Sequence, residues 1–387
     1  MPDLVNCFHQ AFIYLLLILC LSSVWFYGYA IYAAFAFFAD PQPNNPEFHP
    51  PVSILKPICG LDDNAYENLA SFCQQNYPTY QIIFAVQDSQ DPSIEVVEKI
   101  IQNFPDLDIE LIVSDRIIGT NLKVSNLANA ATKTKHDIFI LADSDIRVGT
   151  DYLQQVIQPL QDQNVGVVTC MYRSLAQGWV SIFEDISITT EFHSSVLVSN
   201  QLENGIKYAF GSTIIIRKQV LEAIGGFEAI ADYLADDFQL GYLPTQLGYK
   251  VVLSDYVVDH VQTTTTLIDA INRQIRWTRC KRVSRPWGYL GLIFTYGTVT
   301  SLMLLIATGC SIVGWLGLYI CWVTRLTMAW VVGVISLQDP IAKKYLWILP
   351  LRDIVSFVIW CLGFVCSTIE WRGKRMKLTP EGKLLSP

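Results

Sequence analysis

Hydrophobic residues are distributed unevenly along the chain, and this pattern divides it into parts. Residues 11–39 are apolar and carry no charged side chain, and long apolar runs return between residues 290 and 369. About 20 consecutive apolar residues suffice to cross a bilayer as a helix. The sequence therefore predicts an N-terminal transmembrane anchor (1–39), a Pro-rich linker (40–51), a middle domain (52–288), C-terminal membrane helices (289–371) and a basic tail (372–387).

Two features of the apolar stretches bear on how they lie in a membrane. A cleaved signal peptide is the alternative to an anchor at 11–39, but the run is too long, no basic segment precedes it and its end is rich in aromatic residues. We therefore expect an uncleaved anchor. Near the C-terminus, Arg352 and Asp353 interrupt the apolar run, so they can pair, snorkel to the interface, line a polar cavity or end a helix at the membrane surface.

Between the apolar ends, short apolar runs alternate with segments of helical spacing. Strands are predicted at 51–58, 80–88, 108–114, 137–145, 165–173 and 251–261, helices at 64–75, 94–104, 123–134 and 231–249, and a strand leading into a helix at 208–221. Such alternation predicts an α/β fold with a largely parallel sheet and helices on both faces. Ligands of such sheets bind at the carboxyl ends of the strands.

Composition narrows the function of the middle domain. The net charge of −8 excludes a generally basic nucleic-acid binder. Ten cysteines show no CxxC spacing, and the chain has no Asn-x-Ser/Thr glycosylation site, which together favour a reducing, cytosolic environment. Neither glycine-rich phosphate-binding motif is present. A phosphate-containing ligand would therefore need another kind of site.

Carboxylates lie at the predicted ends of two strands. Asp88 ends the second strand, and Asp143 and Asp145 end the fourth with only Ser144 between them. Like charges this close repel unless something positive lies between them. Mg²⁺ typically takes one or two carboxylates and completes its shell with water and substrate phosphates. The pair is therefore a candidate metal site, although acidic turns after strands are common.

A second acidic pair and a basic helix complete the candidate chemistry. Asp236 and Asp237 begin a predicted helix. Their negative charges either interact favourably with the helix dipole or, beside a diphosphate, supply a general base. Residues 272–285 carry six Arg or Lys and no acid. A basic flank before a membrane span explains the charge. It does not explain Trp277 directly after Arg276, nor Arg273 one turn earlier on the face suited to a diphosphate.

In this order and spacing, the residues resemble the D, D, D, (Q/R)xxRW signature of membrane glycosyltransferases. The surrounding words "VSILKPICGLD", "NLKVSNL", "DSDIRV", "LADDFQLG" and "RQIRWTR" resemble the ceramide glucosyltransferase family, including bacterial relatives associated with hopanoid biosynthesis. The resemblance covers residues 50 to about 290. It implies a GT-A type, Rossmann-like catalytic domain on the cytosolic face of a membrane. It also implies inverting transfer of a sugar from a UDP-sugar to a lipid hydroxyl. Glucose is the leading candidate for the sugar and ceramide for the acceptor.

The resemblance also implies roles for single residues. Asp237 matches the catalytic base, Asp143 and Asp145 match the site of Mg²⁺ or Mn²⁺ and the diphosphate, and many eukaryotic members have Gly in place of Asp145. The implied donor-binding residues are Asp88, Lys123, Asp143, Arg273, Arg276 and Trp277, and the implied acceptor residues are His193, Asp236 and Trp277. Lys123 can equally be a surface residue at a helix start, and His193 a buried structural histidine.

Other interpretations stay open at this point. The acceptor can be a hopanoid intermediate, with N-acetylglucosamine as the sugar, or diacylglycerol. A processive polysaccharide synthase shares the motifs, but three or four membrane spans are few for a polymer channel. A membrane scaffold without activity has no reason to keep every acid and the RxxRW. A cytosolic catalytic domain with three crossings places the basic tail on the cytosolic side, and four crossings place it outside.

Overall fold

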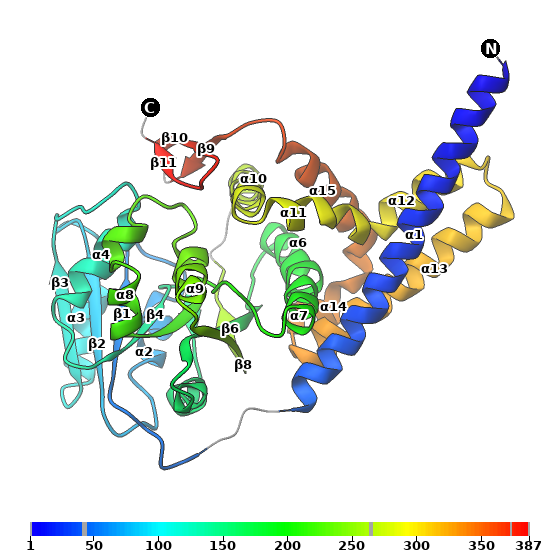
Figure 1. Ribbon diagram of the computed structural model, residues 1–387. Coiled ribbons are helices and arrows are strands. Elements are labelled where there is room, and N and C mark those ends of the chain that lie inside the picture. Colours follow the sequence, from blue (N-terminus) through cyan, green and yellow to red (C-terminus); the bar gives the residue numbers. More distant parts are fainter. Residues whose placement is uncertain (1, 41–44, 263–265, 372–373, 386–387) are drawn as a thin grey trace. The chain divides into compact units, whose positions relative to one another are not determined.

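The structure is a computed structural model that describes residues 2–40, 45–262, 266–371 and 374–385. The chain forms two compact units. One, here called the helical unit, consists of Met1–Ala39, Trp179–Val198 and Thr266–Ser367. The other, called the sheet unit, consists of Asp40–Gly178, Ser199–Thr265 and Thr368–Pro387. Figure 1 gives the labels of their elements.

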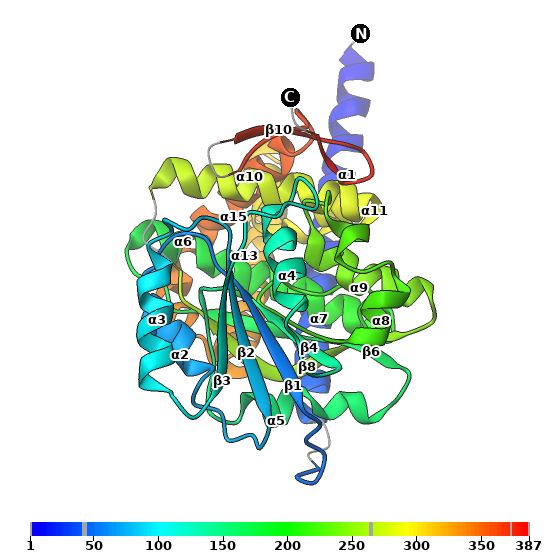
Figure 2. The ribbon, with the colours of Figure 1, turned by 90° about the vertical axis from the view of Figure 1, so that its left-hand side faces the viewer.

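The described part of the sheet unit contains an eight-stranded sheet with the order β3-β2-β1-β4-β7-β6-β8-β5. Its first three strands lie side by side in Figure 2. The strands are β1 (Val52–Pro57), β2 (Tyr80–Val86), β3 (Asp108–Val113), β4 (Ile138–Ala142), β5 (Ile146–Arg147), β6 (Val165–Ser174), β7 (Thr213–Arg217) and β8 (Lys250–His260). All the predicted strands are present, and the two-residue β5 was not predicted.

The direction of the strands differs in part from the prediction. β1 runs parallel to β2 and β4, β2 is parallel to β3, and β6 is parallel to β8. However, β7 is antiparallel to both β4 and β6, and β5 is antiparallel to β8. The sheet is therefore mixed. The apolar run of β7 predicts a strand, but its direction depends on where the chain re-enters the sheet after a helical excursion through residues 179–202.

Helices cover both faces of this sheet, as predicted. Side chains of β1, β2 and β4 that point to one face form the core with α2 and α3, and α4 packs on β1 and β2 from the other. The helices are α2 (Ala65–Ser71), α3 (Ser93–Asn103), α4 (Leu122–Ala131), α5 (Tyr152–Val156), η1 (Gln158–Gln161), α8 (Lys218–Ala223), η3 (Phe227–Ile230) and α9 (Asp236–Gln246). The predicted helix at 231–249 thus begins only at its acidic pair.

The predicted basic tail is a folded part of the sheet unit. Together with residues 368–371, which the prediction placed in the C-terminal membrane helices, it forms a small antiparallel sheet of β9 (Thr368–Trp371), β10 (Lys374–Leu378) and β11 (Leu384–Leu385). Ile369, Met376, Leu378 and Leu384 are buried, whereas their neighbours along the strands are exposed. This alternation is the pattern of a half-buried strand. It is present in the sequence, but the basic residues between the apolar ones obscured it.

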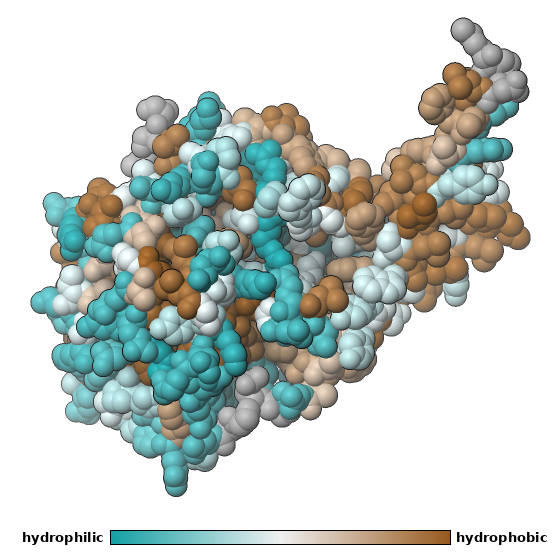
Figure 3. Space-filling model, in the orientation of Figure 1, coloured by the Kyte–Doolittle hydropathy of each residue, from teal (hydrophilic) through white to brown (hydrophobic). Residues whose placement is uncertain are grey.

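The helical unit contains long apolar helices. Within the described residues three helices are long and apolar enough to cross a membrane: Leu4–Ala39, Ile312–Ser336 and Pro340–Leu362. A fourth span is possible if Pro286–Thr295 and Gly297–Ala307, bent by 53° at Tyr296, count as one. Apolar surface covers α1 (Pro2–Ala39) and α13 (Ile312–Ala329) in Figure 3. The protein is a membrane protein.

The remaining helices of this unit follow the chain in order. They are α6 (Trp179–Ser187), η2 (Ile188–Phe192), α7 (His193–Leu202, whose last turn belongs to the sheet unit), α10 (Leu267–Ser284), α11 (Pro286–Gly291), η4 (Leu292–Thr295), α12 (Gly297–Ala307), η5 (Trp330–Ser336), α14 (Pro340–Tyr345), η6 (Leu346–Ile348) and α15 (Leu349–Leu362). Asp353 pairs with Arg325 at 2.9 Å, and Arg352 donates to Ser187 and Gln274. These two neighbours thus have separate partners.

The compact units do not follow the predicted boundaries of the domain at 52–288. Residues 179–198 and the basic helix α10 pack with the membrane helices instead. The reason is visible in the packing of α6, where Ile186 is buried in one cluster with Ala329 and Leu349. An amphipathic helix joins whichever core covers its apolar face, and that partner is distant in the sequence.

Candidate active site

Three of the predicted acidic residues of the sheet unit follow the carboxyl ends of β2 and β4. Asp88 is exposed in the turn after β2, where its Oδ1 accepts the backbone N–H of Gln90 at 2.9 Å. Asp143 is the first residue after β4, and Asp145 is half-buried two positions later. Because β2 and β4 both flank β1 in parallel, their carboxyl ends lie at the same edge of the sheet.

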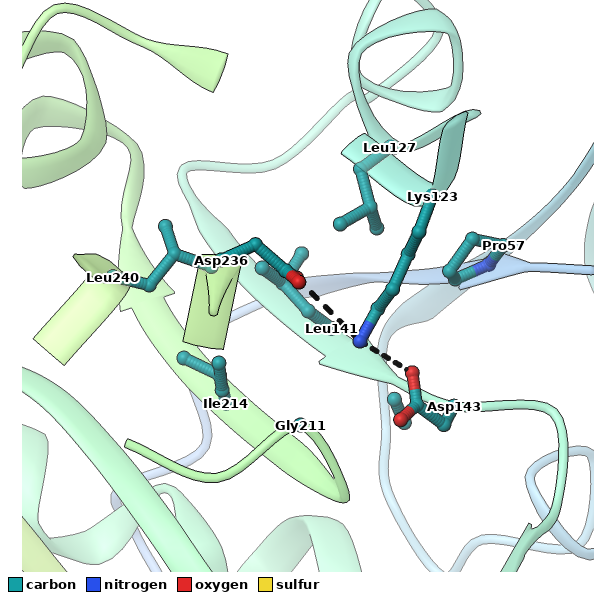
Figure 4. Close-up of a pocket in the computed structure, with 10 residues that line it drawn as sticks. Pro57, Lys123, Leu127, Leu141, Asp143, Gly211, Ile214, Asp236 and Leu240 are labelled. Carbon is teal, nitrogen blue, oxygen red and sulfur yellow. Dashed lines mark ion pairs between the residues drawn. The ribbon is translucent and has the colours of Figure 1, made fainter. Parts of the chain in front are cut away.

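Lys123 connects two of the predicted site residues. It lies in the first turn of α4, and its Nζ is 2.6 Å from Asp143 Oδ1 and 3.5 Å from Asp236 Oδ2 (Figure 4). Burial by itself lowers the pKa of this ammonium, but the carboxylates of Asp143, Asp236 and Asp237 outweigh burial and raise it. Lys123 is therefore a fixed positive charge inside the acidic cluster, not a surface residue.

Two further basic residues compensate the Asp143–Asp145 pair. His260, at the end of β8, places its Nε2 3.1 Å from Asp145 Oδ2. Burial raises the pKa of Asp145, but His260, Lys56 and Lys123 together outweigh burial and the net shift is downward. Lys56 of β1 is fully buried and donates to the backbone carbonyl of Asp143 at 2.5 Å, with its Nζ 3.8 Å from the centre of the Phe72 ring. Burial lowers the pKa of Lys56 to about 7.

Asp237 lies in the first turn of α9, and two backbone groups hold its carboxylate. The N–H of Gly211 donates to Oδ2 at 3.0 Å, and the N–H of Phe238 donates to Oδ1 at 2.8 Å. Burial, followed by the repulsion of Asp236, raises the pKa of Asp237 to about 6 despite Lys123 and these donors. A carboxylate with a pKa near the operating pH can accept a proton during a reaction.

Gly211 leaves space between these groups. A Cβ at this position would lie 3.2 Å from Asp143 Oδ2, 3.3 Å from Lys123 Nζ and 3.5 Å from Asp237 Oδ2. A side chain here would therefore fill the point on which the cation and two acids converge. The lining residues of this small pocket are Pro57, Lys123, Leu127, Leu141, Ala142, Asp143, Gly211, Ile214, Asp236 and Leu240.

The other predicted site residues belong to the helical unit. The guanidinium of Arg273 is bidentate with buried Glu184, at 2.9 Å and 2.5 Å, and lies 5.9 Å from the Trp277 ring. Arg276 is half-buried on the same helix, α10. His193 is fully buried at the start of α7, and its ring is tilted against Phe192 with the centres 5.2 Å apart.

Sequence reasoning missed Lys56, His260, Gly211 and Glu184. A lysine inside the apolar run "VSILKPI" was the available signal for Lys56, since a charge in a buried strand needs a nearby partner. His260 lies near the end of the strand predicted at 251–261, as Asp143 does in the strand predicted at 137–145. Nothing local distinguishes Gly211 or Glu184, because each matters through a residue far away in the chain.

The donor set at Asp143 and Asp145 fits a hard divalent cation. Two carboxylates at the end of one strand supply the oxygen ligands that Mg²⁺ and Mn²⁺ prefer. Within the described residues no group of three or more His, Cys, Asp or Glu side chains is arranged to hold a metal ion. Asp143 and Asp145 would therefore be the protein's share of such a site, with ligand phosphates and water completing it.

The fold is similar to the structure of the mannosyltransferase PcManGT from Pyrobaculum calidifontis in complex with GDP-Man and Mn²⁺. The TM-score is 0.59 at 17% identity, over 92% of this chain and 98% of that one. This similarity shows that the chain has a GT-A type fold.

The family follows from sequence comparison. The model of glycosyl transferase family 21 matches residues 15–384, and the chain belongs to this family. Ceramide glucosyltransferase 1 of Caenorhabditis elegans is 26% identical over 357 residues, which cover 89% of this chain and 74% of that protein. Ceramide glucosyltransferase of Candida albicans is 34% identical over 131 residues, covering 30% of this chain and 24% of that protein. The predicted family is thus confirmed.

Proposed function

We propose that the protein transfers a sugar from a UDP-sugar to the hydroxyl of a membrane lipid. The sugar we propose is glucose and the acceptor is ceramide. The observation that carries the proposal is the Asp237 carboxylate, which two backbone N–H groups hold beside Lys123 and Asp143 in the sheet unit. The names of the relatives support ceramide as the acceptor and glucose as the sugar. The membrane helices support an acceptor that resides in a bilayer.

Asp237 would act as the general base. As the acceptor hydroxyl attacks the anomeric carbon, its proton passes to Asp237, and the bond from that carbon to the diphosphate oxygen breaks. The diphosphate leaves from the opposite face of the sugar, so the configuration inverts and the product is a β-glycoside. The raised pKa of Asp237 makes it a stronger base than an exposed aspartate.

The donor would lie along the edge that carries Asp88, Lys123 and Asp143. Asp88 is exposed and available to the nucleoside, and Lys123 supplies a fixed cation for the diphosphate. Asp143 and Asp145 would hold Mg²⁺ or Mn²⁺, which supplies Lewis-acid neutralisation of a diphosphate leaving group when bound. Arg273, Arg276 and Trp277 would add to donor binding from α10.

The acceptor would come from the membrane. His193 and Trp277 in the helical unit, and Asp236 beside the base, are the proposed acceptor residues. UDP-sugars are cytosolic, so we place the catalytic domain on the cytosolic face. The absence of any Asn-x-Ser/Thr glycosylation site agrees with that placement.

The test is lipid analysis by mass spectrometry. Membranes that contain the protein are incubated with labelled UDP-glucose, UDP-galactose or UDP-N-acetylglucosamine, Mg²⁺, and ceramide, diacylglycerol or a hopanoid. Asp237→Asn is compared with Asp106→Asn, the same change at an exposed acid in the sheet unit. We expect hexosylceramide from the wild type and from Asp106→Asn, and none from Asp237→Asn.

Each alternative has its own result. An N-acetylhexosamine on a hopanoid would keep the mechanism and replace the acceptor and the sugar. Unchanged product from Asp237→Asn would overturn the assignment of the base. A polymer in place of any glycolipid would overturn the lipid acceptor.

A further inference from the structure

The C-terminal strands form a direct connection with the segment that leads into the acidic pair of α9. The backbone N–H of Leu234 donates to Gly382 O at 3.1 Å, and the N–H of Leu384 donates to Asp232 O at 2.7 Å. Tyr233 and Lys383 form an antiparallel β-bridge between these two bonds. Residues 232–234 are thereby paired in the manner of a short strand.

The side chains at this seam support the backbone pairing. Leu384 is 1% exposed and Leu234 is 9% exposed, so each buries its apolar side chain. The Nζ of Lys383 lies 5.4 Å from the centre of the Tyr233 ring, within the range of a cation–π contact. Gly382 is buried at φ +87°, a conformation that favours glycine. The connection is therefore a packed contact of the tail with the sheet unit.

The opposite side of the same segment is bound to the N-terminus of α4. The N–H of Asn121 donates to Ala231 O at 2.8 Å, and the N–H and hydroxyl of Thr120 donate to Asp232 Oδ1 at 2.9 Å and 3.0 Å. A Cβ at Gly119 would lie 2.5 Å from the Cβ of Ala231, so the two backbones meet closely. Residues 231–234 thus lie between α4 and the C-terminal strands.

One side chain links this segment to the acids. Asn121 Nδ2 donates to Tyr233 O at 2.9 Å and to Asp236 Oδ1 at 3.2 Å. Its Oδ1 accepts the N–H of Lys123 at 3.0 Å and so caps α4. The position of Asn121 relative to Tyr233 therefore sets the relation of Lys123 to Asp236, and Asp237 is the next residue.

We propose that the C-terminal strands β9, β10 and β11, in residues 368–371 and 374–385, are a positioning element of the active site. They hold residues 232–234 against the start of α4 and thereby fix where α9 begins. This role rests on the proposed function, because Asp237 is the group being positioned. The strands themselves touch neither Asp236 nor Asp237 within the described contacts, so their effect passes through the segment 231–234.

Positioning predicts a specific kinetic defect. A small displacement of a reacting group can cost about a hundredfold in rate, whereas binding of a nucleotide at the edge of β2 need not change. Loss of the tail contact should therefore lower kcat much more than it raises KM for the donor. A tail that only adds stability would reduce the amount of folded enzyme without altering the kcat of the folded fraction.

The chain offers a matched pair of variants in one strand. Leu384→Arg introduces a charge at a buried position, and Leu385→Arg introduces it next door, where the side chain is 51% exposed. Leu384→Met keeps the volume and the apolar character and tests for rescue. For each variant, kcat and KM are measured in detergent, and hydrogen–deuterium exchange is followed in peptides covering 231–237 and, as an internal control, 108–113.

We expect Leu384→Arg to lower kcat about tenfold or more, as displacement of a reacting group does, with the donor KM little changed. Exchange should accelerate at 231–237 and stay unchanged at 108–113. Leu385→Arg and Leu384→Met should match the wild type. Equal kcat for the two arginine variants, with exchange at 231–237 accelerated only by Leu384→Arg, would overturn positioning. Unchanged exchange at 231–237 would overturn the contact itself.

Hydrogen exchange also separates this inference from the proposed function. It reports the tail contact without substrate, so it remains informative if another residue is the base. If Leu384→Arg fails to fold, exchange of the wild type decides: the amides of Leu234 and Leu384 should be protected, and their rapid exchange would contradict the proposal.

Discussion

At the scale of single residues, the charges of this site are balanced by groups that come from separate strands and helices. Lys123, Lys56 and His260 lie on α4, β1 and β8, and each contacts Asp143 or Asp145. Two acids this close in sequence are tolerable because three basic residues surround them. The positive charge expected from a metal ion is thus supplied partly by these three basic side chains. A bound cation would share Asp143 and Asp145 with them.

Lys56 provides a direct test of this balance. Lys56→Met keeps the length of the side chain but removes the donor to the Asp143 carbonyl and a positive charge near Asp145. A buried carbonyl that loses its donor costs about 1–3 kcal/mol, so the free energy of unfolding should fall by that amount. Thermal unfolding in detergent measures it.

The control for this change is Lys99→Met. Lys99 is exposed and lies over the Tyr66 ring at 5.1 Å, so the same substitution removes no buried charge. It should leave the unfolding temperature nearly unchanged. If Lys56→Met were as stable as Lys99→Met, the buried lysine would not be a structural partner of Asp143.

The protonation of Asp237 predicts a pH dependence of the rate. Its pKa is raised to about 6, and the base must be ionised to accept a proton. Activity should therefore be full above this pKa and fall about tenfold for each pH unit below it. The measurement is kcat against pH at saturating donor and acceptor.

Acid unfolding is the competing cause of such a decline. Enzyme held at the lowest pH and returned to neutral pH should regain full activity if protonation alone is responsible. A rate that stays constant well below the pKa would contradict the role of Asp237 as the base.

At the scale of elements, the basic helix α10 is bound to an acidic partner on α6. Glu184 is 1% exposed, and Arg273 meets it with two hydrogen bonds. Helical spacing predicts α10, but only the packing of α6 shows that Arg273 has a carboxylate beside it. Substitution of Arg273 tests whether this side chain also binds a diphosphate.

Breaking this pair should have unequal consequences. Arg273→Gln leaves the buried Glu184 carboxylate without this cation and should cost about 3 kcal/mol of stability. Glu184→Gln leaves a guanidinium whose side chain is 26% exposed, so its cost should be smaller. Denaturant unfolding of both single variants and the double variant completes the cycle, and the double variant should lose less than the sum of the two.

Kinetics of the same variants separate the two roles of Arg273. A raised donor KM in Arg273→Gln with unchanged stability would show that the arginine serves the diphosphate and not the fold. A stability loss in all variants that adds up exactly would show that the two side chains are independent.

At the scale of the whole molecule, contacts among the membrane helices indicate the path of the chain. His9 Nε2 contacts Ala307 O at 2.9 Å, and the Tyr27 hydroxyl donates to Thr295 O at 2.6 Å. α12 therefore runs antiparallel to α1. The Arg325 guanidinium lies 5.8 Å from the Tyr27 ring, so α13 returns beside α1 in the opposite direction to α12.

The last apolar helix, α15, contacts the start of α12 and the end of α13. Asp353 of α15 accepts a hydrogen bond from Thr298 at 2.6 Å and pairs with Arg325, and Tyr289 donates to Trp360 O at 2.6 Å. Because α12 and α13 run out and back and the tail belongs to the sheet unit, we expect that residues 340–362 do not cross the membrane despite their length. The tail then lies on the side of the sheet unit, as its pairing with residues 232–234 requires.

Glycosylation mapping tests this topology, because the native chain has no acceptor site of its own. Acceptor tags are inserted before residue 1, at 308–311, at 337–339 and after residue 387. With a cytosolic sheet unit, the first two tags should be glycosylated in microsomes and the last two should not. Glycosylation at 337–339 or after 387 would contradict it.

The sequence by itself determined the elements and the chemistry that depends on local pattern. Alternating runs predicted the strands and helices of the sheet unit, and the order of acids and the RxxRW predicted the family. These succeed because strand and helix periods, and the end of a strand, are properties of neighbouring residues.

Only the tertiary structure decided which distant groups meet. Lys56 matters because it donates to Asp143, and Gly211 because it leaves space beside Lys123. The C-terminal strands matter because they pair with residues 232–234. Each of these contacts joins residues more than 80 positions apart, because burial brings together whichever segments complete a core or neutralise a charge. The periodicity of neighbouring residues does not identify a distant partner. The direction of β7, the position of α10 and the fold of the tail are therefore decided by tertiary packing.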